Sequence, residues 1–172
     1  PHAHVLLTTR DIDENGFGKK NVEWNNRELL QEWRESWAEL SNKHLALNGI
    51  DQQIDHRSLK EQGIDLVPQN VELPSDAKDR LTGQRERQLE IMKENGERLK
   101  ENPEIALHAI TNRQSTFTER DIARYVNSRT VNREQYDDVI AKIKGHDSLV
   151  KLVGEEGKEK YTTKEMLDIE RK

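Results

Sequence analysis

The stretch TERDIARYVNSRTVNREQYDDVIAKIK, residues 118–144, predicts two short helices joined by a turn. Thr118 and Asn132 are good N-cap residues, and Asp121 lies in the first turn of the first helix, where a carboxylate is favourable. Apolar residues recur at helical spacing after each cap. We expect a small core made of Phe117, Ile122, Tyr125, Val126, Tyr136, Val139, Ile140 and Ile143.

The segments on either side complete a unit of three helices and a hairpin. Pro103 opens a helix through Ile110, because proline is well tolerated in a first helical turn. Further on, SLVKLV (148–153) predicts a strand, GEEGKE (154–159) a turn and KYTT (160–163) a returning strand. Three short helices followed by a β-hairpin are the element order of a winged helix. The last residues, TTKEMLDIERK, begin another helix.

The N-terminal part has a different pattern. Residues 2–10 alternate as a strand does, and DIDENGFGKKN (11–21) predicts a loop or hairpin turn from its Asn, Asp and Gly content. A helix follows, with Asn25 as N-cap, Glu28 as its capping-box partner and Gly49 as its end. We expect its apolar stripe to pack on the strand; the stripe consists of Leu29, Leu30, Trp33, Trp37, Leu40, His44 and Leu47.

The middle of the chain joins the two parts. IDQQID (50–55) is a second strand candidate, and HRSLKEQG (56–63) predicts one or two helical turns that end at Gly63. Pro68 and Pro74 bracket a stretch that cannot be regular helix. Residues 78–100 are highly charged, and their few apolar residues predict a thinly packed or bridging helix. We therefore divide the chain into residues 1–68, a linker of residues 69–102, and a module of residues 103–172.

Composition limits the classes of function. The 172 residues include 32% hydrophobic and 35% charged residues, which predicts small cores and solvated helices. The absence of Cys excludes disulfides, thiolate zinc sites and a cysteine nucleophile. No apolar run approaches the roughly 20 residues of a membrane span, and no signal peptide is recognisable, so we expect a cytoplasmic location without a membrane partner. The net charge of −5 means that any nucleic-acid binding depends on local basic patches.

The first residues, PHAH, carry two histidines at alternate positions of the predicted strand. His2 and His4 would share one face and could share a divalent cation, for which imidazole is a suitable ligand. A catalytic metal normally takes a third protein ligand, and the sequence offers no obvious one. The alternative is a pair of half-exposed strand histidines without a metal.

Four N-terminal segments together resemble one protein family. They are PHAHVLLTTR (1–10), GFGKKN (16–21), WNNRELLQEWRESWAELSNKHLALNGI (24–50) and IDHRSLKEQGIDLVP (54–68). They resemble the end of the nuclease domain of MobA/MobL-type, TraA-like conjugative relaxases. The resemblance implies that His2 and His4 are two of three metal ligands in an HUH arrangement. They would hold Mg, Mn or Zn in the intact protein, and the third histidine and the tyrosine nucleophile would lie earlier in the family's sequence.

The C-terminal part resembles the same proteins. ALHAITNRQSTFTERDIARYVNSRT (106–130) and YTTKEMLDIERK (161–172) are similar to the segment that leads into their helicase. No G-x-x-x-x-G-K-[ST] loop occurs in the chain, which excludes ATP hydrolysis by these residues. Tyr125, Tyr136 and Tyr161 all lie in the distal module, and we expect none of them to be the nucleophile. The chain does not begin with Met and opens inside a motif, so we expect a fragment.

Four arginines are candidate DNA contacts. Arg10 shares the strand face of His2 and His4, and Arg57 matches an Asp-Arg-Ser segment of the family. Arg120 and Arg124 are one helical turn apart and share a face that could touch a DNA backbone without reading bases. The alternatives are a surface salt bridge for Arg10, a structural role for Arg57 and a solvated helix face for the other two.

The sequence therefore predicts an α+β chain. It would contain the remnant of an HUH-type sheet-plus-helix relaxase domain, a charged helical linker and a winged-helix-like module. The leading interpretation is a fragment of a metal-dependent relaxase that nicks one strand of transfer-origin DNA by tyrosine transesterification. Without its nucleophile and motor the fragment is expected to be inactive. Single-stranded or origin DNA and relaxosome proteins are the expected partners. The alternative is a non-catalytic DNA- or protein-binding adaptor that acts through the distal module.

Overall fold

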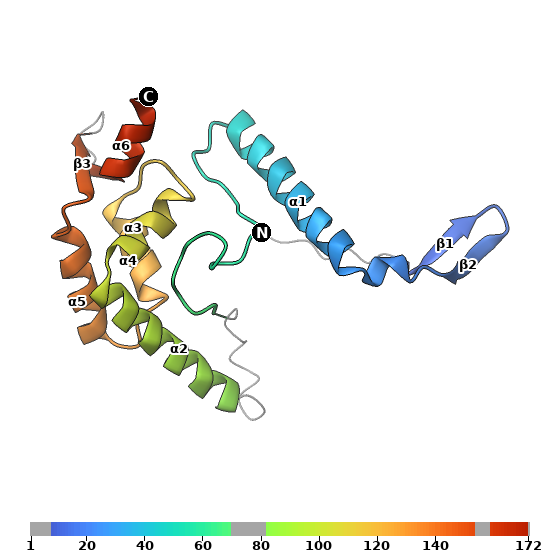
Figure 1. Cartoon of the computed structure of the whole chain (residues 1–172), viewed down its shortest axis with the longest axis horizontal. Helices are drawn as coiled ribbons and strands as arrows, with labels where there is room; N and C mark the ends of the chain where they lie inside the picture. Colours follow the sequence, from blue (N-terminus) through green and yellow to red (C-terminus); the bar gives the residue numbers. More distant parts are fainter. Residues whose placement is uncertain (1–7, 70–81, 154–158, 172) are drawn as a thin grey trace.

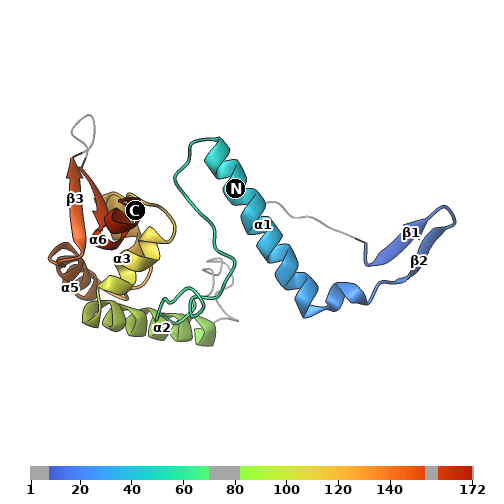
Figure 2. The ribbon, with the colours of Figure 1, turned by 45° about the horizontal axis from the view of Figure 1, so that its top comes forward.

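A computed structural model describes residues 8–69, 82–153 and 159–171, and its α+β class agrees with the expectation. The elements are strands β1 (Arg10–Asp13) and β2 (Gly16–Lys20), the 3-10 helix η1 (Glu23–Asn25), helices α1 (Arg27–Leu47), α2 (Thr82–Glu101), α3 (Glu104–Thr111), α4 (Glu119–Asn127) and α5 (Arg133–Lys144), strands β3 (Leu149–Val153) and β4 (Glu159–Thr163), and helix α6 (Lys164–Glu170). Figures 1 and 2 show α2 to α6 and the β3–β4 hairpin gathered in one unit, called the distal unit below. Helix α1 and the β1–β2 hairpin extend away from it. None of the described helices is long and apolar enough to cross a membrane.

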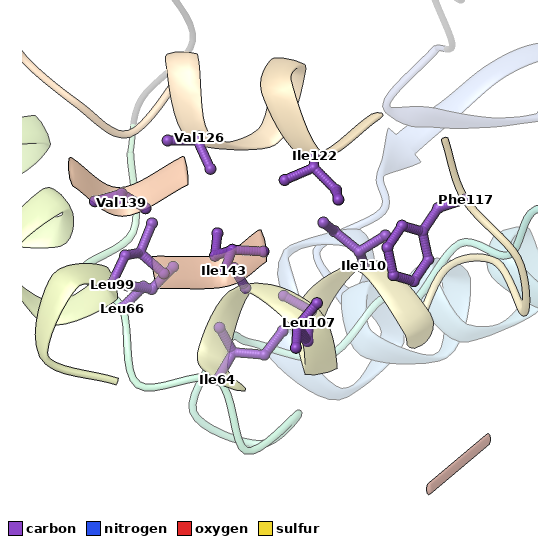
Figure 3. Packing of buried hydrophobic residues seen from close by; sticks show 12 residues of the cluster. Ile64, Leu66, Leu99, Leu107, Ile110, Phe117, Ile122, Val126, Val139 and Ile143 are labelled. Atoms are coloured by element: carbon purple, nitrogen blue, oxygen red, sulfur yellow. The ribbon is translucent and has the colours of Figure 1, made fainter. Parts of the chain in front are cut away.

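One hydrophobic core lies inside this unit (Figure 3). Five of the eight expected core residues are buried, and Tyr125, Tyr136 and Ile140 pack against them at its edge. The buried members are Ile64, Leu66, Leu99, Ala106, Leu107, Ala109, Ile110, Phe117, Ile122, Val126, Val139 and Ile143. The core therefore also takes in Ile64, Leu66 and Leu99, which come from segments outside the predicted three-helix unit.

The predicted caps and hairpin of the distal module are confirmed. Thr118 N–H donates to the Asp121 carboxylate (2.9 Å) while Asp121 N–H donates to Thr118 Oγ1 (3.3 Å), which is a reciprocal capping box. The Asn132 side chain accepts from Gln135 N–H at the start of α5. Strands β3 and β4 pair antiparallel, and Phe117 pairs with Tyr161 in an isolated bridge. The winged-helix assignment stays a prediction.

The N-terminal part differs in detail from the expectation. Most of the predicted strand of residues 2–10 lies outside the described residues, and strand β1 begins only at Arg10. The predicted loop or hairpin turn is a hairpin, because residues 10–20 form β1 and β2. The N-cap of α1 is Asn26 rather than Asn25, since Asn25 ends the preceding 3-10 turn and Asn26 has the extended backbone a cap needs. The apolar stripe of α1 is largely exposed in the described structure, with Trp37 at 68%.

Residues 50–69, called the strap below, contain no strand, so the predicted strand at 50–55 is wrong. Two asparagines hold the strap instead. Asn42 on α1 donates to Ile54 C=O (3.0 Å) and accepts from Ile54 N–H (2.7 Å). Asn95 on α2 donates to Val67 C=O (2.9 Å) and accepts from Val67 N–H (2.7 Å). Each side-chain amide thus supplies the two hydrogen bonds that a neighbouring strand would supply.

The strap is also attached to the loop between α3 and α4. The Asp51 carboxylate accepts from Ser115 Oγ–H (2.7 Å) and Ser115 N–H (3.2 Å), and Gln53 N–H donates to Arg113 C=O (2.7 Å). Its turn ends, as expected, at Gly63, which has a positive φ of 74° that favours glycine. The next residue, Ile64, enters the core. The strap is therefore attached to the distal unit near both of its ends.

The second half of α2 is not thinly packed, contrary to the sequence expectation. Leu99 is fully buried, and Asn95 is 1% exposed. The Gln135 side chain of α5 lies against Gly96, donates to Lys93 C=O (2.9 Å) and to the Glu97 carboxylate (2.9 Å), and accepts from Val131 N–H (3.0 Å). The expectation counted only apolar side chains and so missed a helix face built from an asparagine and a glycine. The three-part division of the chain stays a prediction.

Replacing Gly96 by alanine tests this contact. A Cβ at this position would lie 2.3 Å from Gln135 Cδ, so Gly96→Ala must displace a side chain held by three hydrogen bonds. We expect the free energy of unfolding in urea to fall by about 1–3 kcal/mol. In the matched variant Gly83→Ala the new Cβ meets no atom within 4 Å. Because Gly83 lies in the first turn of α2, this variant should change the free energy of unfolding by less than about 0.5 kcal/mol. Equal effects of the two variants would contradict the packing of α2 on α5.

Candidate nucleic-acid interface

A groove of about 610 Å³ lies between α4 and α5 and contains both predicted DNA contacts of the distal module. Arg120 and Arg124 lie one turn apart on α4, and Arg133 is the first residue of α5. The turn that joins the two helices supplies the remaining polar edge of the groove. The residues lining it are Arg120, Ala123, Arg124, Asn127, Thr130, Val131, Asn132, Arg133 and Tyr136.

The groove is basic within an acidic chain. Three of its nine described lining residues are arginines and none is acidic, while the whole chain has a net charge of −5. In the described part of the chain, neither Arg120 nor Arg124 forms an ion pair within 4 Å. Exposed guanidinium groups of this kind suit phosphate oxygens, which they can contact in a bidentate manner.

Arg133 and Tyr136 were not predicted as site residues. The Arg133 side chain donates to the Asp137 carboxylate (2.9 Å), and its guanidinium carbon lies 5.2 Å from the centroid of the Tyr136 ring. The hydrogen bond from Arg133 to Asp137 raises the pKa of Arg133. Their spacing along α5 shows that the two residues are neighbours. Only the packing of α5 against α4 brings them to Arg120 and Arg124.

Arg129 stabilises the turn between α4 and α5. Its guanidinium lies over the Tyr125 ring, 3.7 Å from the centroid, and it donates to Tyr125 C=O (3.0 Å) and to Ser128 Oγ (2.7 Å). Burial lowers the pKa of Arg129 and raises the pKa of Tyr125. Thr130 Oγ1–H also donates to Val126 C=O (3.0 Å). These contacts fix the turn whose next residues line the groove.

The other predicted site residues do not join this groove. His2 and His4 lie outside the described residues, and among those that are described no group of three or more His, Asp or Glu could hold a metal. Arg10 is exposed and its guanidinium donates to Gly18 C=O (3.0 Å) across the β1–β2 hairpin. The roles of Arg10, Arg120 and Arg124 in binding DNA, and of the histidines in binding metal, stay predictions.

Arg57 lines a second groove, of about 320 Å³, between α1 and the strap. Its guanidinium is paired with the Asp55 carboxylate, with Nη2 to Oδ2 at 2.6 Å and Nε to Oδ1 at 3.0 Å. These hydrogen bonds lower the pKa of Asp55, while partial burial acts in the opposite direction. A phosphate would have to compete with Asp55 for this guanidinium, so the geometry favours the structural alternative for Arg57.

Comparison with known proteins finds similarity along almost the whole chain. Residues 1–79 match the model of the MobA/MobL family. Over 99% of its length the chain is 27% identical to the probable conjugal transfer protein TraA of Sinorhizobium fredii and 30% identical to the conjugal transfer protein TraA of Rhizobium radiobacter. It spans 19% of each of these relatives. A match to mobilization protein A of Escherichia coli is 30% identical over 40% of the chain and 12% of that protein. No solved structure matches the chain.

The Asp55–Arg57 pair predicts a pH-dependent contribution to stability. Because the pKa of Asp55 is lowered in the folded state, the pair stabilises the fold above the unfolded-state pKa. This contribution is lost as the pH falls through the lowered value. In Arg57→Ala, carboxyl NMR titration should find the pKa of Asp55 raised toward its ordinary value, whereas Arg10→Ala should leave it where it was. An Asp55 titration that is the same in all three proteins would contradict the pairing.

Proposed function

Because residues 1–79 carry a MobA/MobL family domain, and the whole chain is similar to TraA conjugal transfer proteins, we propose that it is part of a conjugative DNA relaxase. The observation that carries this proposal is the similarity to TraA over 99% of the chain. Residues 1–68 then belong to the relaxase domain, and residues 103–172 form a winged-helix-like module that precedes a helicase. The protein would act in the cytoplasm on single-stranded or transfer-origin DNA, together with other relaxosome proteins.

The proposed reaction is strand-specific nicking, in which a tyrosine hydroxyl loses its proton and its oxygen attacks the phosphorus of a phosphodiester. A phosphotyrosyl bond forms, the bond from phosphorus to one sugar oxygen breaks, and that oxygen takes up a proton and leaves as a free hydroxyl. His2 and His4 would be two of the three ligands of a divalent ion, Mg, Mn or Zn. Such an ion supplies positive charge where the reacting phosphate becomes more negative. The donor chemistry of a His-x-His pair fits this role. Tyr125, Tyr136 and Tyr161 pack against the core of the distal unit, which supports assigning the nucleophile to another part of the protein.

The groove between α4 and α5 supplies a DNA contact in this proposal. Arg120 and Arg124 would bind phosphate oxygens of the DNA backbone, which gives affinity without sequence information. This contact is also what favours the second candidate, a non-catalytic adaptor that acts through the distal module alone. The two candidates differ in whether activity needs a metal ion at His2 and His4. Arg10, on the hairpin that follows these histidines, belongs with the metal-dependent candidate.

The relaxase proposal is tested by removing both histidines from the full-length protein that contains this chain. We expect His2→Ala/His4→Ala to reduce nicking of a supercoiled plasmid with a transfer origin by at least about 100-fold, since even the outer partners of metal ligands contribute 10–100-fold. A chelator should stop nicking by the parent protein, and added Mg²⁺ or Mn²⁺ should restore it.

His44→Ala is the matched control, because His44 is an exposed histidine of α1 and is not one of the predicted metal ligands. It should nick at the parent rate. Undiminished nicking by the His2/His4 double variant would remove these residues from the reaction. A full-length protein that binds DNA but never nicks it, with or without metal, would favour the adaptor.

A further inference from the structure

We propose that the groove between α4 and α5 binds an unpaired DNA strand, with phosphates at Arg120 and Arg124 and a base against Tyr136 and Arg133. The inference rests on the proposed function and deepens it, because it names the form of DNA that the distal module takes. It depends on three observations: the concave shape of the site, the aromatic ring among its cations, and the charge of the first turns of α5.

The shape of the site suits a strand that enters it. The three arginines line a hollow that also contains Ala123, Val131 and Tyr136, so its lining is both cationic and apolar. A duplex presents its phosphates on a convex surface, and proteins read it by inserting a projecting helix or ribbon. A single strand is narrow enough to follow a hollow and can place both its phosphates and a base there.

The Tyr136 ring adds a contact that only an unpaired base can use. The ring packs on the core at one side and also lines the groove, and the Arg133 guanidinium lies 5.2 Å from its centroid. Aromatic rings and guanidinium planes are the surfaces on which free bases stack. In a duplex the base faces are covered by their neighbours and cannot reach this ring.

The charge of α5 opposes the usual winged-helix contact with a duplex. In helix-turn-helix proteins the N-terminal residues of the recognition helix enter the major groove. In α5, the third helix of the predicted winged-helix-like module, residues 133–138 include one arginine and three carboxylates, Glu134, Asp137 and Asp138. Asp137 pairs with Arg133 and Asp138 pairs with Lys100 of α2, so these turns present no unpaired cation to the phosphates of a duplex. Arg120 and Arg124, which form no ion pair with a described residue, lie on α4 rather than on α5.

The test measures binding of labelled oligonucleotides to the 172-residue chain by fluorescence anisotropy. A single strand of about 12 nucleotides should bind about tenfold more tightly than a duplex of the same length. Arg120→Ala/Arg124→Ala should weaken single-strand binding at low salt. It should also reduce the slope of log K against log salt concentration by about 1.4, or about 0.7 for each phosphate contact.

Two tyrosine variants separate stacking from charge. Tyr136→Leu should weaken single-strand binding about tenfold without changing the salt slope, because it removes the ring and leaves the cations. Tyr136→Phe keeps the ring and its packing and should bind as the parent does. Arg85→Ala/Arg87→Ala is the charge-matched control for Arg120→Ala/Arg124→Ala. Both of its arginines are exposed on the first half of α2, outside the groove, and the variant should keep most of the affinity for the single strand. Circular dichroism of each variant checks that it is folded.

Two results would overturn the inference. One is a duplex bound at least as tightly as the single strand. The other is a folded Tyr136→Leu or Arg120→Ala/Arg124→Ala variant that binds the single strand as tightly as the parent does. A parent chain that does not bind the single strand at all would overturn the inference in the same way. Both results leave the relaxase proposal intact, because nicking that depends on His2 and His4 is measured in the full-length protein. Failure of the relaxase proposal appears separately, as nicking that is indifferent to those histidines.

Discussion

The paired hydrogen bonds between the Asn95 side chain and the backbone of Val67 hold the arrangement of the chain together. Asn95 is almost completely buried, and its amide satisfies both the N–H and the C=O of a residue that has no neighbouring strand. Buried backbone groups need such partners. With Val67 held, Ile64 and Leu66 reach the core that α2, α3, α4 and α5 share. Ile64 and Leu66, which lie within the segment that matches the MobA/MobL family, therefore share one core with the distal unit.

This packing extends to the groove. At the end of the strap, Gln69 donates to Ser128 C=O (2.9 Å), in the turn that Arg129 also holds. On the other side, Gln135 accepts from Val131 N–H and donates to Lys93 C=O of α2. The turn between Arg124 and Arg133 is thus fixed by contacts from the strap and from α2. The position of the groove relative to the strap and to α2 therefore follows from these hydrogen bonds.

The sequence predicted the features that depend on local chemistry. Thr118 and Asn132 are caps because of their own side chains, and the spacing of Ile122, Val126 and Val139 is enough to identify a helical core. The strand predicted at residues 50–55 failed because a strand needs a partner strand. The partners here are the Asn42 side chain of α1 and, in the loop between α3 and α4, Arg113 C=O and Ser115. The buried face of α2 was missed because it contains Asn95 and Gly96. In the same way, Arg120 and Arg124 are one helical turn apart and so are predictable as neighbours. That Tyr136 lines the same groove depends on how α4 and α5 pack, which their sequences do not show.

Native-state hydrogen exchange at the Val67 amide tests most directly whether the strap belongs to the core. If it does, this amide opens only when the core opens, and its opening free energy matches those of the Val139 and Ile143 amides within about 1 kcal/mol. Exchange of the Val67 amide at nearly the rate of an unprotected residue, with Val139 and Ile143 still protected, would contradict the account. The strap would then be a separate segment resting on the surface of the distal unit.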